Sequence, residues 1–357
     1  MSHAFKGVLT AVLLATSLIF QACSGQRGPV DGGVVRLQGA GATFPNPLYQ
    51  KWLSEYAKTN PNVRIDYQSI GSGGGIKQIE ARTIDFGATD IPVDDQELSN
   101  FPREILHIPT VLGAVVLTYN LPELKEPLRF SPEVIADIFL GKIRRWDDAR
   151  IKADNPTVTL PAADITVVHR SDGSGTTAVF TDYLVKISPE WKEKVGTGTS
   201  VKWPLGLGAK GNEGVTGQIK QTPNTIGYVE LAYAVQNKLP VARIKNRSGN
   251  YIEPTLDSVT EAAAESAANM PADLRISITD AAGAAAYPIA SYTYILVYKE
   301  QEDAAKGKAL VDFLWWAVHD GQRFARELQY APLPETVVRR VEEKLRSITF
   351  GGKPLRP

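Results

Sequence analysis

Apolar and polar residues follow two different periods along the chain from Val34 onward. In "VRIDYQSI" (63–70) the apolar residues Val63, Ile65 and Tyr67 alternate with polar residues, which predicts a half-buried β-strand. In "TFPNPLYQKWLSEYAK" (43–58) apolar residues recur at helical spacing, which predicts a helix with one buried face. Strands and helices alternate in this way over most of the sequence. Such alternation is typical of α/β architecture.

The same patterns predict the other elements. Further strands are expected at 34–41, 85–90, 113–120, 164–170 and 292–299. Further helices are expected at 76–84, 132–143, 178–186, 261–269, 309–321 and 336–345. At 357 residues the chain is long enough for two domains with substantial cores.

Charge limits the class of partner. The sequence has 39 Lys and Arg residues and 39 Asp and Glu residues, so no overall field attracts nucleic acid or anionic lipid. A nucleic-acid-binding protein would be expected to carry a basic stripe. Any anion site must therefore be made by local geometry. The four histidines are scattered and Cys23 is the only cysteine, so neither a metal site nor a cofactor is expected.

The N-terminus has the features of an export signal. Lys6 precedes an apolar run from Val8 to Phe20, which is shorter than the about 20 residues of a transmembrane helix. We expect a signal peptide over residues 1–22 and a flexible tether over 23–33. Cys23 lies just past the apolar run, which favours a lipid anchor on a periplasmic or otherwise exported protein. Because "IFQAC" fits the bacterial lipoprotein box poorly, cleavage without lipid attachment stays open.

Three loops share one design, in which a strand leads through small residues into a helix. They are "GAGATF" (39–44), "GSGGG" (71–75) and "SDGSGTT" (171–177). The first turn of a helix has unpaired N–H groups and a partial positive charge, so anions bind there. Any one loop alone is better explained as ordinary turn chemistry. If the three meet at the carboxyl ends of parallel strands, they surround a small tetrahedral anion with donors.

Known nucleotide-binding and catalytic motifs do not match these loops. "GSGGGIKQ" has Ile76 where both the nucleotide P-loop and the dinucleotide fingerprint require glycine. The surroundings of Ser174, "DGSGT", are not a serine-hydrolase elbow. Neither an activated nucleophile nor a metal-bound water is indicated, so the predicted site holds its ligand and does not cleave it.

Three charged residues suggest how the anion is selected. Arg170 supplies positive charge and a forked hydrogen-bond donor, and Asp172 can hold that guanidinium in place. An ordinary turn or helix-cap role for Asp172 stays open. Asp90 ends the strand that follows the second loop, so it is expected to face the same site. An ionised carboxylate only accepts hydrogen bonds, so it pairs with a protonated phosphate and rejects fully ionised sulfate.

Seven segments resemble, in order, the substrate-binding protein of the high-affinity phosphate ABC transporter. They are "GAGATFPNPLYQKW", "GSGGGIKQI", "DFGATD", "LGKIRRWDD", "DGSGTTAVFTDYL", "GTGTSVKWPLGLGAKGNEGV" and "TIGYVELAYA". The resemblance extends from about Gly39 to the C-terminus. It implies a two-lobed periplasmic binding protein of type II-like fold. Each lobe would be a mixed, mainly parallel sheet flanked by helices, and two crossover strands would join the lobes.

The resemblance also implies the site residues and the partners. Phosphate would be bound between the lobes, and His169 departs from the pattern because a second basic residue is expected there. A monomer would deliver phosphate to the membrane permease subunits of the transporter. The implied phosphate contacts are Ala42, Thr43, Phe44, Ser72, Asp90, Arg170, Ser174, Gly175 and Thr176, with Asp172 in support.

The family further implies crossovers near 109–113 and 287–292. Lobe 1 would comprise residues 34–110 and 287–357, and lobe 2 residues 111–286. The basic residues around Lys142 are expected to form a solvated face more than a docking patch. A receptor for sulfate or molybdate, an exported phosphatase and a scaffold protein stay open as alternatives. The acceptor character of Asp90 argues against the first, and the missing nucleophile argues against the second.

Overall fold

The computed structural model describes residues 33–356, apart from the side chains at positions 265 and 268. The expected signal peptide, most of the expected tether and Cys23 lie outside the described residues. Within the described part of the chain, no helix combines the length and apolarity needed to cross a bilayer.

One eight-stranded sheet runs through the described residues in the order β2-β1-β3-β11-β4-β8-β6-β7. β1 pairs parallel with β2 and β3, and β6 pairs parallel with β7 and β8. β4 and β11 run antiparallel to their neighbours. The strands are β1 Val35–Gly41, β2 Val63–Ser69, β3 Phe86–Thr89, β4 Ile105–Tyr119, β6 Thr166–Arg170, β7 Leu207–Ala209, β8 Thr225–Glu230 and β11 Ala290–Tyr298. The predicted mixed α/β class is confirmed.

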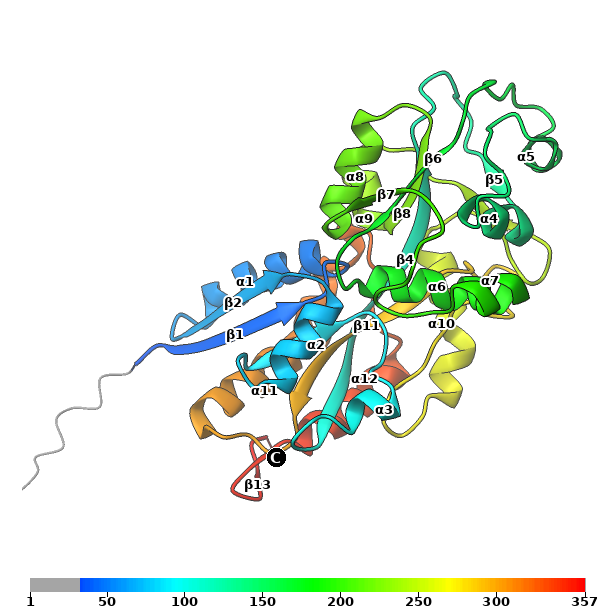
Figure 1. The fold of residues 1–357 in the computed structure, drawn as a ribbon. Helices are drawn as coiled ribbons and strands as arrows, with labels where there is room; N and C mark the ends of the chain where they lie inside the picture. The colour runs from blue at the N-terminus through cyan, green and yellow to red at the C-terminus, as the bar shows by residue number, and fades with distance from the viewer. Residues whose placement is uncertain (1–32, 357) are drawn as a thin grey trace, which may run out of the picture. The chain divides into compact units, whose positions relative to one another are not determined.

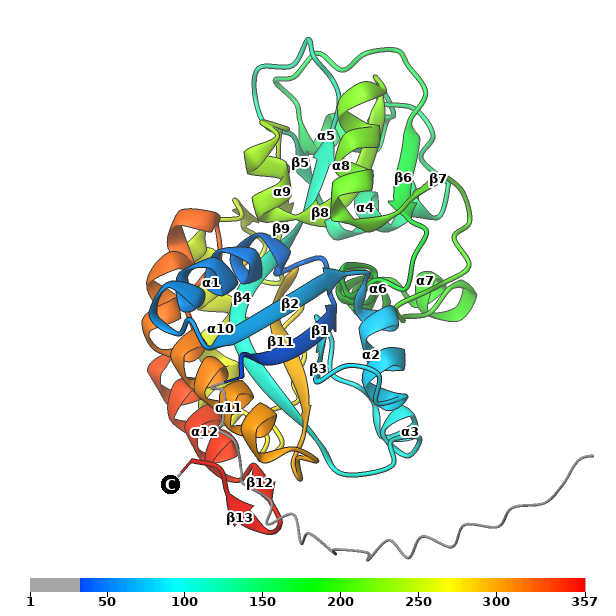
Figure 2. The same cartoon turned by 90° about the vertical axis from the view of Figure 1, so that its left-hand side faces the viewer.

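Helices cover both faces of this sheet. Beside β1, α1 and α11 lie on one face and α2 on the other (Figure 2). The α-helices are α1 Asn46–Thr59, α2 Ser72–Glu80, α3 Asp95–Leu98, α4 Pro132–Phe139, α5 Ala149–Asp154, α6 Gly175–Ile187, α7 Pro189–Lys194, α8 Gly211–Gln221, α9 Leu231–Gln236, α10 Leu256–Asn269, α11 Ala304–Val318 and α12 Glu335–Arg346. Two 3₁₀ turns, Asp320–Phe324 and Arg326–Leu328, connect α11 to α12. Small sheets are formed by β5 Arg129–Phe130, β9 Arg243–Lys245 and β10 Tyr251–Ile252, and by β12 Thr349–Phe350 and β13 Lys353–Pro354.

β4 is shared by two groups of strands. Its residues from Ile105 to Ala114 pair with β11, and its residues from Val115 to Tyr119 pair with β8 (Figure 1). All of its residues are buried, because both faces and both edges are covered. We call β2, β1, β3 and β11 the first strand group, and β8, β6 and β7 the second strand group. The two expected crossovers fall on β4 and on the segment that enters β11.

A β-bulge interrupts the pairing of β4 with β11. Thr293 pairs with Val111 and Tyr294 with Pro109, so Thr110 is the extra residue. Proline has no N–H for the ladder and is tolerated within sheets at such bulges. The Thr110 hydroxyl donates to the Thr293 carbonyl oxygen at 3.2 Å. Bulges re-aim neighbouring side chains, and this one lies beside Thr293, which contacts Asp90.

The predicted helix 43–58 corresponds to α1, and its apolar face is buried as expected. Tyr49, Trp52 and Tyr56 lie in the core together with Leu48. The indole N–H of Trp52 donates to the Gly321 carbonyl oxygen at 2.8 Å, so the buried polar end of this side chain is satisfied. The strand predicted at 63–70 corresponds to β2, whose burial alternates as predicted.

Several predicted boundaries are wrong, and each error has a local cause. The helices predicted to begin at residues 76 and 178 begin at Ser72 and Gly175, because the small residues of the loops form the first helical turns. The strand predicted at 113–120 begins at Ile105, since Pro109 conceals the strand pattern. The helix predicted at 261–269 begins at Leu256, after a capping box formed by Thr255 and Ser258.

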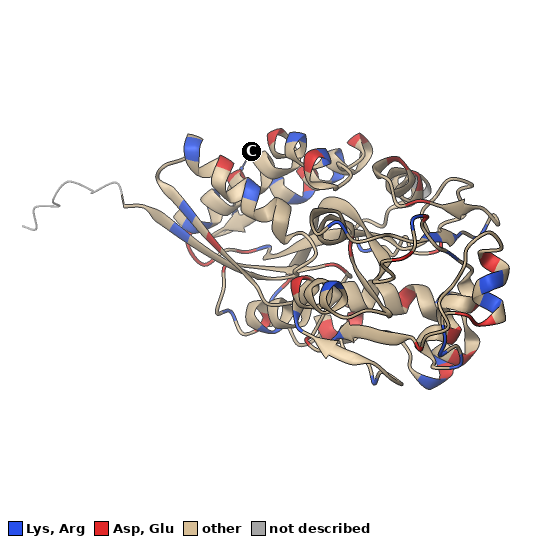
Figure 3. Cartoon of the chain, turned by 90° about the horizontal axis from the view of Figure 1, so that it is seen from above, with Lys and Arg blue, Asp and Glu red and all other residues tan. Residues whose placement is uncertain are grey.

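Charged side chains of both signs are interspersed over the ribbon (Figure 3). Lys142 pairs with Asp137 at 3.5 Å and also contacts Glu190. Arg145 pairs with Asp147 at 3.0 Å. All of these pairs are partly exposed, as in a solvated face, and such pairs contribute little to stability.

The packing of α2 on the sheet generates a prediction about Gly75. A Cβ at this position would lie 2.5 Å from Gly41 Cα and 2.7 Å from the Ala40 carbonyl oxygen, both backbone atoms. Gly75→Ala should therefore lower the free energy of unfolding by about 1–3 kcal/mol or more. Urea denaturation measures this change.

Gly217→Ala is the matched control, because Gly217 lies inside α8 and a Cβ there meets nothing within 4 Å. This change should raise the free energy of unfolding by about 0.5–1 kcal/mol through helix propensity alone. Equal effects at the two glycines would contradict the close approach of α2 to β1.

Candidate functional site

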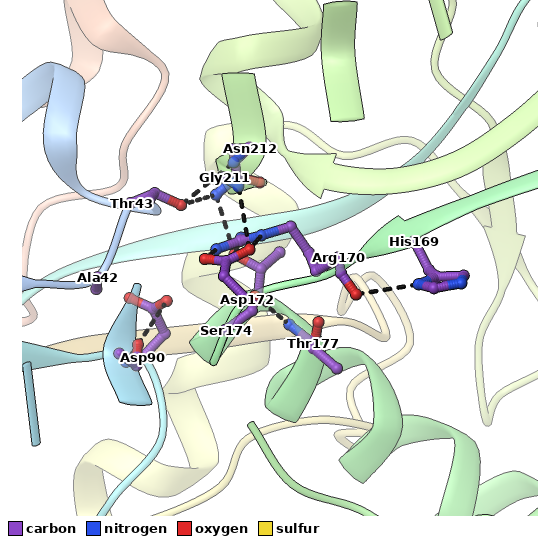
Figure 4. A network of polar contacts seen from close by, with 12 residues as sticks. Ala42, Thr43, Asp90, His169, Arg170, Asp172, Ser174, Thr177, Gly211 and Asn212 are labelled. Carbon is purple, nitrogen blue, oxygen red and sulfur yellow. Dashed lines mark hydrogen bonds and ion pairs between the residues drawn. The ribbon is translucent and has the colours of Figure 1, made fainter. Parts of the chain in front are cut away.

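The three loops meet at one buried place. The Gly73 N–H donates to the Gly173 carbonyl oxygen at 2.9 Å, which joins the second loop to the third. A Cβ added at Gly175 would collide with Ser72 Oγ and Asp90 Oδ2, so the start of α6 lies directly against these two side chains. Thr43 of the first loop is linked to α8 by a hydrogen bond from Asn212 (Figure 4). Both strand groups therefore contribute to the site.

The first loop presents the backbone of Thr43 and Phe44. The carbonyl oxygens of these residues accept hydrogen bonds from Tyr233 and Tyr330, both at 2.6 Å. Among residues 33–356 no acceptor engages the N–H groups of Thr43 or Phe44. The Ala42 N–H, in contrast, donates to the Ala88 carbonyl oxygen at 3.0 Å and is not available to a ligand. The expected phosphate contact of Ala42 therefore does not use its N–H group and otherwise stays a prediction.

The second and third loops supply helix starts. Ser72 is the first residue of α2 and is fully buried. Ser174 is the N-cap of α6, and its Oγ accepts the Thr177 N–H at 3.0 Å. The N–H groups of Gly175 and Thr176 belong to the first turn of α6, where no intrahelical acceptor exists. These groups can donate to an anion, and the helix dipole favours negative charge at the same position.

Arg170 is the last residue of β6 and is only 3 % exposed. Its Nε and Nη2 donate to the two carboxylate oxygens of Asp172, at 2.7 and 2.5 Å. Nη1 donates to Thr176 Oγ1 at 3.3 Å. Burial by itself raises the pKa of Asp172, but the hydrogen bonds and charge of Arg170 hold it below its usual value. Asp172 thus fixes the guanidinium and leaves its Nη1 edge directed toward the start of α6.

Asp90 follows β3 and is fully buried. Its Oδ1 accepts the Thr293 hydroxyl at 2.9 Å, and Ser72 Oγ lies 3.4 Å from Oδ2. Burial raises the pKa of Asp90 to about 7, although Thr293, the charge of Arg170 and Ser72 each act in the opposite direction. The Asp90 carboxylate lies against Ser72 of α2 and against Gly175 of α6, so it faces the starts of both helices.

His169 does not compensate for the missing second basic residue. Its ring stacks on Trp203 with centroids 4.9 Å apart, and Nδ1 lies 3.0 Å from the Arg170 carbonyl oxygen. Burial lowers the pKa of His169, which favours the neutral ring. The positive charge at the site therefore comes from Arg170.

The structure adds residues that the sequence patterns did not single out. Asn212 bridges Thr43 and Thr176, Thr293 holds Asp90, and Tyr233 holds the first loop. Asn212 lies within a fourth strand–glycine–helix segment, "LGAKGNEGV" (207–215), so the design of the other loops could have revealed it. Thr293 lies opposite the bulge in β4, and no local motif signals that position.

Glu230 is a second buried carboxyl close to this cluster. Its Oε2 accepts the Ala232 N–H at 2.8 Å and lies 3.2 Å from the Tyr330 hydroxyl. Burial raises the pKa of Glu230 well above its usual range. No group of three or more metal-ligating acidic, His or Cys side chains occurs in residues 33–356. The arrangement as a whole is a buried set of hydrogen-bond donors with one cation, Arg170, and with the Asp90 carboxyl at the starts of α2 and α6, which suits a small protonated oxyanion.

Fold and site together define a two-lobed α/β binding protein for a small anion. Residues 26–317 match the family described as the PBP superfamily domain. The chain is 47% identical over 310 residues to the phosphate-binding protein PstS of Xylella fastidiosa, covering 86% of this chain and 84% of that protein. It is 44% identical over 322 residues to the PstS of Methanocaldococcus jannaschii, covering 84% and 82%.

Solved structures share the fold. A high affinity periplasmic phosphate-binding protein, PfluDING, bound with phosphate, aligns with a TM-score of 0.69 at 22% identity, covering 87% of this chain and 93% of that one. The phosphate-binding protein from Stenotrophomonas maltophilia aligns with a TM-score of 0.66 at 20% identity, also covering 87% and 93%. The predicted two-lobed fold class is confirmed.

The chain therefore belongs to the PBP superfamily and, within it, to the PstS family of phosphate-binding proteins. This is a family of periplasmic solute receptors and not a family of enzymes.

The raised pKa of Asp90 generates a prediction about stability without phosphate. Folded protein keeps a proton on Asp90 up to about pH 7, whereas the unfolded chain releases it near the ordinary value of 3.8. Between these values the folded state binds one more proton, so the free energy of unfolding falls as pH rises. Asp90→Asn removes this dependence, so its stability relative to wild type should increase by a few kcal/mol between about pH 4 and pH 8.

Urea denaturation in phosphate-free buffer at several pH values measures the difference. Asp85→Asn is the control, because it removes the carboxyl at the other end of β3 and leaves Asp90 in place. A constant difference between Asp90→Asn and wild type over this range would contradict the buried, protonated state of Asp90.

Proposed function

We propose that this protein binds inorganic phosphate between its two strand groups and delivers it to an ABC-type phosphate importer. The observation that carries the proposal is one fully buried carboxylate, Asp90, set among helix-start donors and a buried arginine. Relatives that share nearly half of the sequence are named phosphate-binding proteins, which supports the same ligand here.

The proposed contacts come from all three loops. Backbone N–H groups of the first loop, the hydroxyls and N–H groups at the starts of α2 and α6, and the Arg170 guanidinium donate to the phosphate oxygens. Ala42 shapes the first loop without donating its own N–H. The proposed donors are Thr43, Phe44, Ser72, Arg170, Ser174, Gly175 and Thr176, with Asp172 holding Arg170.

Asp90 acts in this proposal as a test for a proton on the ligand. When it is ionised, its Oδ2, which has an acceptor position besides the one that faces Ser72, accepts a hydrogen bond from a P–O–H group. Sulfate has no proton at neutral pH, so its oxygen would face the carboxylate oxygen without a hydrogen bond. Sites that require a particular hydrogen discriminate by about 10⁴–10⁵ when the analogue leaves buried polar groups unpaired.

The wider organisation is also part of the proposal. Residues 34–110 and 287–357 form lobe 1 and residues 111–286 form lobe 2, which accords with β4 joining two strand groups. The protein acts as a monomer, binds no nucleic acid and catalyses no reaction. The balance of 39 basic and 39 acidic residues argues against nucleic acid as a partner, and the absence of a nucleophile pattern in the sequence argues against catalysis.

Titration calorimetry with phosphate and with sulfate tests the function. We expect wild type to bind phosphate with micromolar or tighter affinity, about −8 kcal/mol or better, and to reject sulfate. Asp90→Asn should bind sulfate measurably, because an amide can donate as well as accept. Equal binding of both anions by wild type, or full rejection of sulfate by Asp90→Asn, would remove the proposed role of Asp90.

Asp85→Asn is the matched control for this experiment. Asp85 and Asp90 flank β3 at its two ends, and Asp85 accepts hydrogen bonds from the Gln38 N–H and from Lys306. The control removes the same charge from the same strand while leaving the site intact. Its preference for phosphate over sulfate should equal that of wild type.

Anchoring through Cys23 is proposed from the sequence alone. The cysteine lies three residues after Phe20, the end of the apolar run, in the region where a cleaved lipoprotein carries its lipid. We expect the mature protein to fractionate with membranes and Cys23→Ser to become soluble after export. Mass spectrometry of the mature N-terminus distinguishes this from cleavage without lipid, which would give an unmodified thiol.

A further inference from the structure

Asn212 lies at the start of α8 and is fully buried between the two strand groups. Its Nδ2 donates to Thr43 Oγ1 at 2.7 Å and to Thr176 Oγ1 at 3.0 Å. Thr43 follows β1 of the first strand group, and Thr176 lies in α6, which follows β6 of the second. One amide group therefore contacts both threonines that stand at the proposed phosphate site.

The orientation of the Asn212 side-chain amide is fixed by the hydrogen bond that its oxygen atom accepts. Asn212 Oδ1 accepts the backbone N–H of Glu230 at 2.9 Å. A backbone N–H can only donate, so the oxygen must face Glu230 and the NH₂ group must face the threonines. Both amide hydrogens are then used, one for each hydroxyl oxygen.

Each threonine oxygen has both of its acceptor positions filled. Thr43 Oγ1 receives the side-chain amide of Asn212 and, at 3.4 Å, the Asn212 backbone N–H. Thr176 Oγ1 receives the same amide and, at 3.3 Å, Nη1 of Arg170. A hydroxyl has two acceptor positions and one donor hydrogen. Nothing in residues 33–356 accepts a hydrogen bond from either hydroxyl, so both hydrogens are left to donate to a ligand.

We propose that Asn212 is a positioning residue that makes Thr43 and Thr176 act as donors to phosphate. This inference rests on the proposed function, because it assumes that phosphate occupies the site. Without the amide, each hydroxyl could rotate and turn a lone pair toward the anion. Asn212 thus sets affinity for the anion, whereas Asp90 sets the choice between phosphate and sulfate.

Asn212→Ala tests the inference. We expect phosphate to bind roughly 10-fold more weakly, because two neutral hydrogen bonds that orient the threonines are lost. Sulfate should still be rejected, since Asp90 is unchanged. Asn212→Ser keeps one donor and should bind with intermediate affinity, and it serves as the readout if the alanine variant does not fold. Calorimetry gives the Kd, and thermal unfolding shows that each variant is folded.

Asn246→Ala is the matched control for removing a buried asparagine. Its amide donates to the carbonyl oxygens of Gly283, Ala284 and Ala286, and none of these belongs to the proposed site. Phosphate affinity should be unchanged in this variant. An equal loss of affinity in both asparagine variants would mean that Asn212 acts only through general stability, and the inference would be wrong.

A double-mutant cycle separates positioning from other effects. In a Thr43→Val, Thr176→Val background the hydroxyls are absent, so Asn212→Ala should change the Kd less than about 2-fold. The full loss in that background, or no loss in the wild-type background, would overturn the inference. If wild type itself fails to bind phosphate, the proposed function fails instead, and the two failures are distinct.

Discussion

The structure depends on burying a guanidinium and a carboxylate from different strand groups close together and away from solvent. Arg170 and Asp90 are 3 % and 0 % exposed. A buried charge is tolerated only when it is paired or fully hydrogen-bonded. Asp172 satisfies two donors of Arg170, and Thr293 and Ser72 contact Asp90. The same requirement accounts for the fixed amide of Asn212 and for the tyrosine hydroxyls that hold the first loop.

The loops can enclose a small anion because their helices begin so close to one another. Gly175 has no room for a side chain beside Ser72 and Asp90, so the backbone itself forms the wall of the site. Donors then outnumber acceptors, which suits an oxyanion, and the one acceptor decides whether the ligand must carry a proton. The residues that set the affinity for the anion therefore differ from Asp90, which sets the selectivity, although all of them line the same site.

The sequence predicted most of this site and less of the fold that holds it. Helix starts rich in glycine, serine and threonine are local patterns, so Ser72, Arg170 and Ser174 could be named from the loops. Pro109 interrupts the strand pattern in the first half of β4, so this half was not predicted. The bulge opposite Thr293 depends on pairing between distant strands. The availability of the Ala42 N–H also depends on such pairing, because the Ala88 carbonyl oxygen accepts its hydrogen bond. Contacts that depend on the register between two strands cannot be predicted from the residue pattern of either strand alone.

Sharing β4 between the two strand groups restricts how they can move. A loop connection would allow one group to swing freely, but here every residue of the connecting strand is buried, and all of them except Thr110 pair with β11 or β8. Relative motion must be absorbed as torsion along that strand near Ala114 and Val115, where its partner changes from β11 to β8. A motion of one strand group against the other is therefore coupled to the backbone of β4 and cannot leave its hydrogen-bonded ladder unaffected.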